Sequence, residues 1–376
     1  MFGLLALSVI WAHLSIRWMR LSRRTLTRVG QVGKVLEEEF ALTNAGALPK
    51  LWVEVSDESD LPNHYASRAL GWLQGNNWRG WRVRTLCTER GRFRLGPVKV
   101  TSGDPLGVYQ RSRRLQAYSN VLVYPAVYDL PHFPLRSTFV PGGEAIRKRA
   151  QHTTTNAAGV RDYVNGDSLN RIHWPLSIRR NKLTVKEFEL DPTSDYWIFV
   201  DMNKDVQVAM NFVTEPLNDN PTYMLPPSSE EYGVSLAASV SQHFVREGRT
   251  VGLLAYSTHR QIVQPDRGER QHNKILESLA VIKAQGDVPF DRMVRSEGTH
   301  LARGSTVICI SSSADPAWGS AAAQLNRNGA RVIAIVIDRS TFGSSTSTDD
   351  VMTALLQGGV VSRLIKFGDS FTDALS

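Results

Sequence analysis

The chain has 376 residues, which is long enough for two domains with ordinary cores, and its 42% hydrophobic and 21% charged residues argue against a disordered chain. Its two cysteines, Cys87 and Cys309, are too few for a disulfide framework or a structural zinc site. The formal net charge of +8 suits nucleic acid, an anionic membrane surface or an acidic partner, so the positions of the charges must decide.

An apolar run opens the chain. Residues 1–16 contain no Asp, Glu, Lys or Arg, and four arginines follow within residues 17–24. We therefore expect a membrane anchor helix with a basic flank over residues 1–24, although a spanning helix needs about 20 residues and this run is short. A helix that lies on the membrane surface is the alternative. A signal peptide is less favoured, because its charges should precede the apolar run.

The same arginines predict an orientation. Lys and Arg collect on the cytoplasmic side of membrane helices, so arginines downstream of the run place the soluble domains in the cytoplasm, at the cell membrane. A further helix before residue 1 would turn the anchor into a hairpin and would leave this orientation unchanged.

Residues 25–125 have the pattern of short strands and turns. Period-two alternation over residues 35–44 and 48–57, with Gly and Pro between later segments, predicts an antiparallel β-sandwich. Residues 90–96 are typical of turn chemistry. The tryptophans of this region favour core packing with a few exposed rings over an aromatic face for sugar or nucleic acid; they are Trp52, Trp72, Trp78 and Trp81.

Residues 126–158 have no sustained period and are rich in Pro, Gly, Thr, Asn and Arg, which predicts a linker. The next segment, residues 159–194, is the most patterned of the chain. Asp167 or Ser168 is a good helix N-cap, Pro175 limits that helix, and residues 183–190 alternate as a strand. Its arginines, acids and tryptophan suit a network of charge-assisted hydrogen bonds.

Four short motifs within this segment resemble a known family. They are Val160-Arg161-Asp162-Tyr163, Gly166-Asp167, Arg171-Ile172-His173-Trp174 and Val185-Lys186-Glu187-Phe188. With the lead-in motifs RG, LGP, DPLG and VYP between residues 90 and 125, they are similar to the domain-of-unknown-function family 58 (DUF58) over most of the chain. Where that family commonly has a small residue, this chain has Ile178.

Nine residues of these motifs are expected to form a binding or structural signature. They are Arg161, Asp162, Tyr163, Gly166, Asp167, Arg171, Trp174, Lys186 and Glu187. Among them, we expect Arg161, Asp167 and Trp174 to matter most for holding the two domains together.

Residues 195–376 alternate apolar strands with amphipathic helices, which predicts a doubly wound parallel sheet. The DUF58 resemblance implies a von Willebrand factor A-like fold for this region. Ligands of such sheets bind at the carboxyl ends of the strands, so residues 201–205 and 311–315 form the candidate site. No G-x-G-x-x-G or P-loop follows a strand, which argues against a nucleotide site.

The first of these loops is a candidate metal site. A von Willebrand A metal site places Asp-x-Ser-x-Ser after the first strand, with a Thr and an Asp from later loops as further oxygen ligands for Mg²⁺. Here Asp201, Asn203 and Asp205 offer oxygens, whereas Lys204 adds a competing cation. We expect a vestigial loop and keep Mg²⁺ binding as the alternative.

The function that these observations favour is a membrane-anchored, non-enzymatic protein-interaction module. The resemblance implies a MoxR-type AAA+ ATPase as the partner, in the maturation or assembly of other proteins. Residues 214–229 form an insertion with several Pro and Asn residues beside the Asp201 loop, and we expect them to contact the partner.

The alternatives are a divalent-metal-dependent adhesion-type domain and a metal-dependent hydrolase. The hydrolase would use Asp201 and Asp205 with His152, His173 or His259, but no His-x-x-x-His motif, nucleophile elbow or paired-carboxylate spacing supports it. Nucleic acid is not expected as a partner, because much of the basic excess lies near the N-terminus and no stacking platform is evident.

Overall fold

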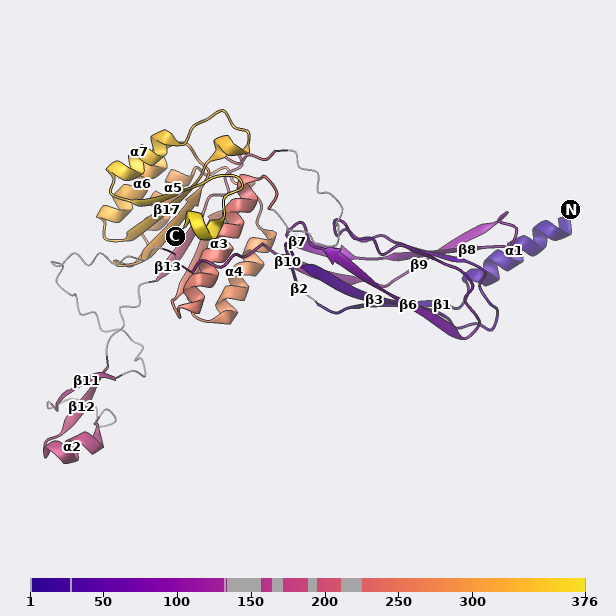
Figure 1. Ribbon diagram of the computed structural model, residues 1–376, viewed down its shortest axis with the longest axis horizontal. Helices are drawn as coiled ribbons and strands as arrows, with labels where there is room; N and C mark the ends of the chain where they lie inside the picture. Colours follow the sequence, from indigo (N-terminus) through magenta and orange to yellow (C-terminus); the bar gives the residue numbers. More distant parts are fainter. Residues whose placement is uncertain are drawn as a thin grey trace. The chain divides into compact units, whose positions relative to one another are not determined.

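A computed structural model describes residues 2–27, 29–131, 133, 157–163, 172–188, 195–210 and 225–375. The chain divides into two compact units. The main unit combines Met1–Phe133 with Tyr196–Ser376, and the insert unit consists of Pro134–Asp195. Figure 1 shows the elements of both units, which are described separately below.

The N-terminal helix is shorter than the predicted anchor. Helix α1 spans Phe2–Ile16, and strand β1 spans Met19–Thr25, so the predicted basic flank is largely a strand. Trp18, with a positive φ of 61°, turns the chain between them. The Lys50 ammonium donates to the carbonyl of Leu14 at 2.7 Å, at the carboxyl end of α1. Among the helices of the described residues, none has both the length and the apolarity needed to cross a membrane.

Three sheets build the β region of the main unit. The first has the order β1-β3-β6, in which β3 is Val35–Asn44 and β6 is Asn77–Leu86. The second has the order β5-β4-β8-β9, formed by Arg68–Leu70, Val53–Asp57, Val98–Gly103 and Gln110–Leu115. Both sheets are antiparallel. The third has the order β2-β10-β7, formed by Val29–Gln31, Ser119–Tyr124 and Gly91–Leu95, and its β2–β10 pair is parallel.

The first two sheets share one hydrophobic core, as the alternating sequence pattern predicts. Phe40 of β3 and Trp81 of β6 stack at the centre of the first sheet, with ring centroids 5.3 Å apart. Trp78 and Trp72, by contrast, are 63% and 52% exposed. The tryptophans are therefore divided between core and surface.

The α/β region of the main unit contains a six-stranded sheet of order β15-β14-β13-β16-β17-β18. All neighbouring pairs are parallel except β14–β15. The strands are β13 Tyr196–Val200, β14 Val251–Tyr256, β15 Arg260–Asp266, β16 Thr306–Ser311, β17 Arg331–Ile337 and β18 Val361–Ile365. The predicted strand-helix alternation and parallel sheet are confirmed, except that the edge strand β15 is antiparallel, which was not predicted.

Helices cover both faces of this sheet (Figure 1). They are α3 Ser229–Arg246, α4 Glu269–Val281, α5 Phe290–Gly298, α6 Pro316–Arg327, α7 Asp349–Gln357 and the short α8 Phe371–Ala374; the 3₁₀ helix η2 spans Arg339–Phe342. Side chains of α5, α6 and α7 share one core with alternate residues of the strands. Helix α3 packs on the opposite face, where Gly233 approaches Ile310 and Ile337.

The insert unit contains a strand pair and a short helix. Strands β11, Ala157–Asp162, and β12, Thr184–Phe188, are antiparallel, and helix α2 spans Trp174–Arg180. Pro175 was expected to limit a helix that starts near residue 168, but in α2 it occupies the first turn. Proline is tolerated there because the first-turn N–H groups have no partner within the helix. His173 is the N-cap, and its Nδ1 accepts the N–H of Leu176 at 3.2 Å.

Candidate functional site

Two neighbouring strands of the six-stranded sheet end in polar side chains at the same edge. Asp201 follows β13 directly, and β16 ends at Ser311, with Val200 and Ile310 in parallel register. From β13 the chain continues through α3 to β14, whereas from β16 it continues through α6 to β17 on the other side. The strand order therefore reverses between β13 and β16, which is where open α/β sheets bind ligands.

We call this place the switch-point site. It consists of Asp201, Asn203, Gln207, Ser229, Ser311, Ser312 and Ser313. The buried strands before each loop fix the start of the loop, and the Asp201 N–H donates to the carbonyl of Ile310 at 2.9 Å. The first residue of one loop is thereby held against the last residues of β16.

The carboxylate of Asp201 is buried, with 4% of the residue exposed. Its Oδ2 accepts the hydroxyl of Ser311 at 2.6 Å, and its Oδ1 accepts the N–H of Asn203 at 3.1 Å. The Ser311 hydroxyl oxygen also accepts the N–H of Ser313 at 2.9 Å. One carboxylate thus ties together the loops that follow two different strands.

Gln207 extends this network toward helix α3. Its Nε2 donates to the carbonyl of Asp201 at 2.9 Å, and its Oε1 accepts the hydroxyls of Ser229 at 2.7 Å and Ser312 at 3.2 Å. Ser229 in turn accepts the N–H of Val208 at 2.9 Å. The switch-point site is consequently a layer of polar side chains at the edge of the sheet, held in place by hydrogen bonds to one another.

Charged side chains lie outside this layer. Lys204 is exposed and forms an ion pair with Asp287 at 2.6 Å, and Asp205 is also exposed. Gly286 pairs with Asn203 through a backbone bridge, and a Cβ atom at Gly286 would lie 2.3 Å from the carbonyl oxygen of Tyr256. Only glycine allows this close approach.

Burial raises the pKa of Asp201 from its ordinary 3.8 to about 6, although hydrogen bonds from Ser311 and Asn203 act in the opposite direction. The donors around the carboxylate are neutral hydroxyl and N–H groups. They stabilise its charge less than a cation would, so desolvation prevails.

The predicted metal ligands fit a braced loop better than a magnesium shell. Asp201, Asn203 and Asp205 share one loop as predicted, but Asn203 Oδ1 accepts the N–H of Asp205 at 2.8 Å and the Asp205 side chain is exposed. Within the described parts of the chain, no group of three or more His, Cys, Asp or Glu side chains is arranged to hold a metal ion. Magnesium requires near-octahedral oxygen ligands. Its binding here stays a prediction.

The second predicted loop has a mixed role. Ser311, Ser312 and Ser313 join the switch-point site, whereas Asp315 is the N-cap of α6 and accepts the N–H of Ala317 at 2.8 Å. Trp318 Nε1 donates to the carbonyl of Ser313 at 3.0 Å. The loop is therefore fixed from both ends.

The predicted signature residues belong to the insert unit. Arg161 and Asp162 lie in β11, opposite Val185 and Thr184, and Lys186 and Glu187 lie in β12 opposite Val160 and Gly159. The pairing of β11 with β12 therefore brings the first of the four motifs, at residues 160–163, beside the last, at residues 185–188. Tyr163 follows β11, and its N–H donates to the carbonyl of Leu183 at 2.8 Å.

Trp174, the first residue of α2, is 58% exposed. Gly166, Asp167 and Arg171 lie outside the described residues, as do His152 and most of the predicted contact loop at 214–229. The expectation that this signature holds two domains together therefore stays a prediction.

The histidines proposed for hydrolysis have other local roles. His173 caps helix α2 in the insert unit, and His259 is exposed beside Thr258 in the turn before β15.

Sequence reasoning missed Arg90, which joins the β region to the α/β region within the main unit. Its fully buried guanidinium donates to the carbonyls of Leu279 and Ile282 at 3.0 and 2.7 Å, at the carboxyl end of α4. It also pairs with Glu230 at 2.6 Å and with Glu231, both in the first turn of α3. Residues 90–96 were assigned to turn chemistry, and only the RG lead-in motif drew attention to this arginine.

Arg23 was also misassigned. It was expected in the basic flank of a membrane anchor, but its side chain is 2% exposed and pairs with Glu38 at 2.9 Å and Asp57 at 3.0 Å. His64 Nε2 lies 3.0 Å from the Asp57 carboxylate, and Ser59 donates to it. We call these five side chains the Arg23 cluster. Its members come from separate strands and loops, so no local motif could reveal it.

Comparison with known proteins adds a family match. The family model described as "Protein of unknown function DUF58" matches residues 159–341, which include much of the insert unit and the whole switch-point site. The uncharacterised protein YeaD of Bacillus subtilis is 24% identical over 208 residues, or 55% of this chain. The match spans 47% of YeaD, about half the length of that relative.

Solved structures show only weak likeness. The CARDB domain of the PF1109 protein from Pyrococcus furiosus is 17% identical with a TM-score of 0.22, and covers 28% of this chain and 86% of that one. A human complex of zinc 2-glycoprotein with prolactin inducible protein gives 10% identity and a TM-score of 0.22, over 27% of this chain and 92% of that one. Neither likeness carries an argument about function.

Proposed function

We propose that the protein is a non-enzymatic interaction module that acts at the cytoplasmic face of a membrane and binds a protein partner through the carboxyl edge of its six-stranded sheet. The observation that carries this proposal is the bracing of the switch-point site. Both oxygens of Asp201 accept internal hydrogen bonds, so this acid positions its loop. The loop in turn presents Lys204 and Asp205 at the surface.

A braced loop suits recognition because little conformational entropy is lost when a partner binds it. The buried residues set the shape of the loop, and its exposed charges provide the specificity and orientation that polar groups give an interface. The DUF58 resemblance makes a MoxR-type AAA+ ATPase the first candidate partner. The polar loop after the first strand of the parallel sheet supports the von Willebrand A-like fold that the resemblance implies.

Crosslinking in native membranes, followed by capture of this protein, tests the proposal. We expect a MoxR-type ATPase to be recovered with the natural chain and to be lost when Lys204→Asp reverses the exposed charge. Reproducible absence of the ATPase with the natural chain would count against the partner.

The chain offers a matched control for that experiment. The double variant Lys204→Asp/Asp287→Lys keeps an ion pair while exchanging the two charges. Loss of capture in both variants indicates that the partner recognises the positive charge at position 204. Recovery in the double variant indicates that it needs only the loop geometry fixed by the pair.

A divalent-metal-dependent form of this interaction, or a metal-dependent hydrolase, is the second candidate. Two hard oxygen atoms, Oδ2 of Asp201 and the hydroxyl of Ser311, meet at the switch point 2.6 Å apart, and this favours the second candidate. Calorimetric titration with Mg²⁺ or Mn²⁺ tests the idea against Asp201→Ala. Equal heats for the two proteins would exclude a metal site that depends on Asp201.

A further inference from the structure

A second surface of the α/β region has the properties of a peptide-binding edge. Strand β15 lies at one edge of the six-stranded sheet, and its neighbour in the sheet is β14. No further strand among the described residues pairs with its outer edge. Alternate residues of an antiparallel edge strand direct their N–H and C=O groups away from the sheet, where another chain can pair with them.

This edge lacks the usual protection over its middle. Charged residues and proline blunt most natural edge strands. Here Arg260 begins β15 and Pro265 and Asp266 end it, but residues 261–264, Gln-Ile-Val-Gln, carry no charge. Arg260 is itself neutralised by a two-bond ion pair with Glu297, at 2.8 Å for each bond. A short uncharged stretch of edge is thus left available.

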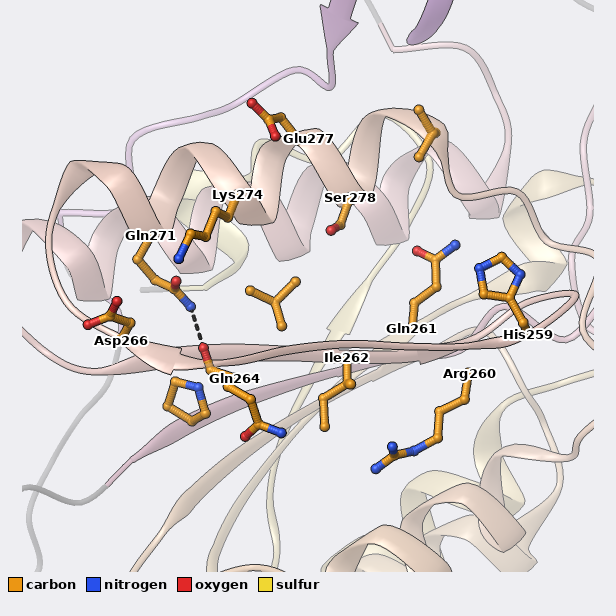
Figure 2. A pocket seen from close by; sticks show the side chains of 13 residues that line it. His259, Arg260, Gln261, Ile262, Gln264, Asp266, Gln271, Lys274, Glu277 and Ser278 are labelled. Atoms are coloured by element: carbon orange, nitrogen blue, oxygen red, sulfur yellow. Dashed lines mark hydrogen bonds between the residues drawn. The ribbon is translucent and has the colours of Figure 1, made fainter.

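A groove of about 790 Å³ runs between this strand and helix α4 (Figure 2). Val263 of the strand and Val281 of the helix contribute apolar surface to it. Gln271 holds the two elements together, because its Nε2 donates to the carbonyls of Val251 and Gln264 at 2.7 Å each. The groove therefore has a fixed wall before any ligand arrives.

The side-chain amide of Gln271 also leaves one hydrogen-bond acceptor of the groove without a donor in the described part of the chain. Because Nε2 makes both of these bonds, the remaining amide atom is the acceptor Oε1. It is buried and has no hydrogen-bond partner among the described residues. Buried acceptors of this kind normally have a donor, so a ligand that brings N–H groups to this strand-helix junction suits it.

The charged side chains around the groove indicate the charge of its ligand. In Figure 2, Lys274 extends from α4 toward the strand, whereas the carboxylate of Glu277, which also lines the groove, points away from the strand. The Glu277 carboxylate also interacts with the hydroxyl of Tyr124. Asp266 lies at the far end of the strand, where it accepts the N–H of Arg267 at 2.8 Å. Within the described residues, Lys274 forms no ion pair, so it can pair with an acidic side chain.

From this arrangement we propose that β15 and α4 bind an extended acidic segment of a partner protein, which adds as a strand to the edge at residues 260–264. Backbone hydrogen bonds to β15 supply affinity, and pockets for alternate side chains supply specificity, as in other strand-addition complexes. The bound segment places an acidic side chain beside Lys274 and apolar side chains against Val263 and Val281.

Fluorescence anisotropy with a labelled, capped peptide tests this site in the full chain; every second residue of the peptide is valine or glutamate in turn, with threonine between them, so that both kinds of side chain face α4. We expect it to bind at least about tenfold more tightly than the corresponding valine-lysine peptide, because like charges facing each other are strongly unfavourable. Lys274→Glu should reverse that preference, whereas Lys366→Glu, at an exposed position after β18, should leave it unchanged. A valine-glutamate peptide with methylated backbone nitrogens should not bind.

Hydrogen exchange of the backbone amides then locates the peptide. Protection that appears at residues 260–264 upon peptide addition supports the proposal. It is overturned by equal binding of all three peptides, by no binding at millimolar concentration, or by protection elsewhere. Protection at 260–264 in a dimer without peptide would assign the edge to a second copy and would also overturn it.

This inference is independent of the proposed partner at the switch-point site. Lys204→Asp, which is expected to abolish capture of the ATPase, should leave the preference for the acidic peptide unchanged, because Lys204 pairs with Asp287 and does not line the groove. The two proposals can therefore fail separately.

Discussion

Two carboxylates of the main unit are withdrawn from water and respond in opposite ways. In the β region, burial alone would raise the pKa of Asp57, but hydrogen bonds from His64 and Ser59 and the charge of Arg23 outweigh it and lower the pKa. In the α/β region, Asp201 has only neutral donors, and burial raises its pKa to about 6. The sign of each pKa shift therefore depends on whether the hydrogen bonds and charges around the carboxylate together outweigh its desolvation.

The difference also separates two roles. The Arg23 cluster lies between strands, with side chains of Arg23, Glu38, Asp57 and His64 only 1–2% exposed, so its charges serve the fold. Asp201 lies at the end of a strand, at the reversal of strand order, and it fixes a loop with exposed charges. The first arrangement stabilises a core, and the second positions a surface.

Removing the cation should produce the largest effect. Arg23→Met leaves Glu38 and Asp57 buried without their partner, and we expect the free energy of unfolding to fall by about 3–5 kcal/mol, as when one member of a buried ion pair is removed. Chemical denaturation measures this loss.

Arg24→Met is the matched control, because Arg24 is exposed on the same strand, and it should change stability by no more than about 0.5 kcal/mol. Adding Glu38→Gln and Asp57→Asn to Arg23→Met should restore part of the lost stability by removing the unpaired charges. A loss below about 1 kcal/mol for Arg23→Met alone would contradict a structural role for the cluster.

The second test concerns Asp201 and its dependence on pH. Because its pKa is higher in the folded chain than the ordinary 3.8, the folded state binds the proton more tightly, and ionisation of this group lowers stability as pH rises from about 4 to 6. A shift of this size corresponds to about 3 kcal/mol. Asp201→Asn cannot ionise, so its stability relative to the natural chain should increase by about that amount between pH 4 and 7.

Unfolding by urea at several pH values measures this relative stability. Other titrating groups act equally in both proteins and cancel in the difference. A difference that stays constant across the range would show that Asp201 is ionised throughout, as a bound cation or an open loop would make it.

The sequence reveals the switch-point site better than the Arg23 cluster for a physical reason. Parallel strands are buried on both faces and appear as continuous apolar runs, as in residues 196–200 and 306–311. The polar residue after each run therefore marks the carboxyl edge of the sheet, and topology brings the two loops together. Asp201 and the serines at 311–313 could be found in this way.

No such rule identifies a buried arginine. Strand β1 contains Arg20, Arg23 and Arg24 within seven residues, and its sequence does not show which of them faces a core. Only the pairing of β1 with β3, and the approach of Asp57 from another sheet, distinguishes Arg23. The same limit applies to Arg90, whose partners are about 140 to 190 residues away in the sequence.

The smallest predicted loss of stability is that of a Ser311 variant. This variant separates the contribution of a neutral hydrogen-bond donor to the pKa of Asp201 from the contribution of burial. The Ser311 hydroxyl lowers the pKa of Asp201 against the larger effect of burial. Ser311→Ala should therefore raise this pKa further and cost about 1.5–3 kcal/mol where Asp201 is ionised, the range for a hydrogen bond to a charged group. The cost should shrink as pH falls through about 6, because Asp201 becomes protonated in the folded chain.

Ser312→Ala is the matched control, because the Ser312 hydroxyl contacts Val206 and Gln207 but not the Asp201 carboxylate. Its cost should be nearly independent of pH, and denaturation at about pH 4 and 7 distinguishes the two variants. If both serines showed the same pH dependence, the donor to Asp201 would not be Ser311. Burial would then raise the pKa of Asp201 without an opposing hydrogen bond from Ser311, whereas hydrogen bonds and a neighbouring charge lower the pKa of Asp57.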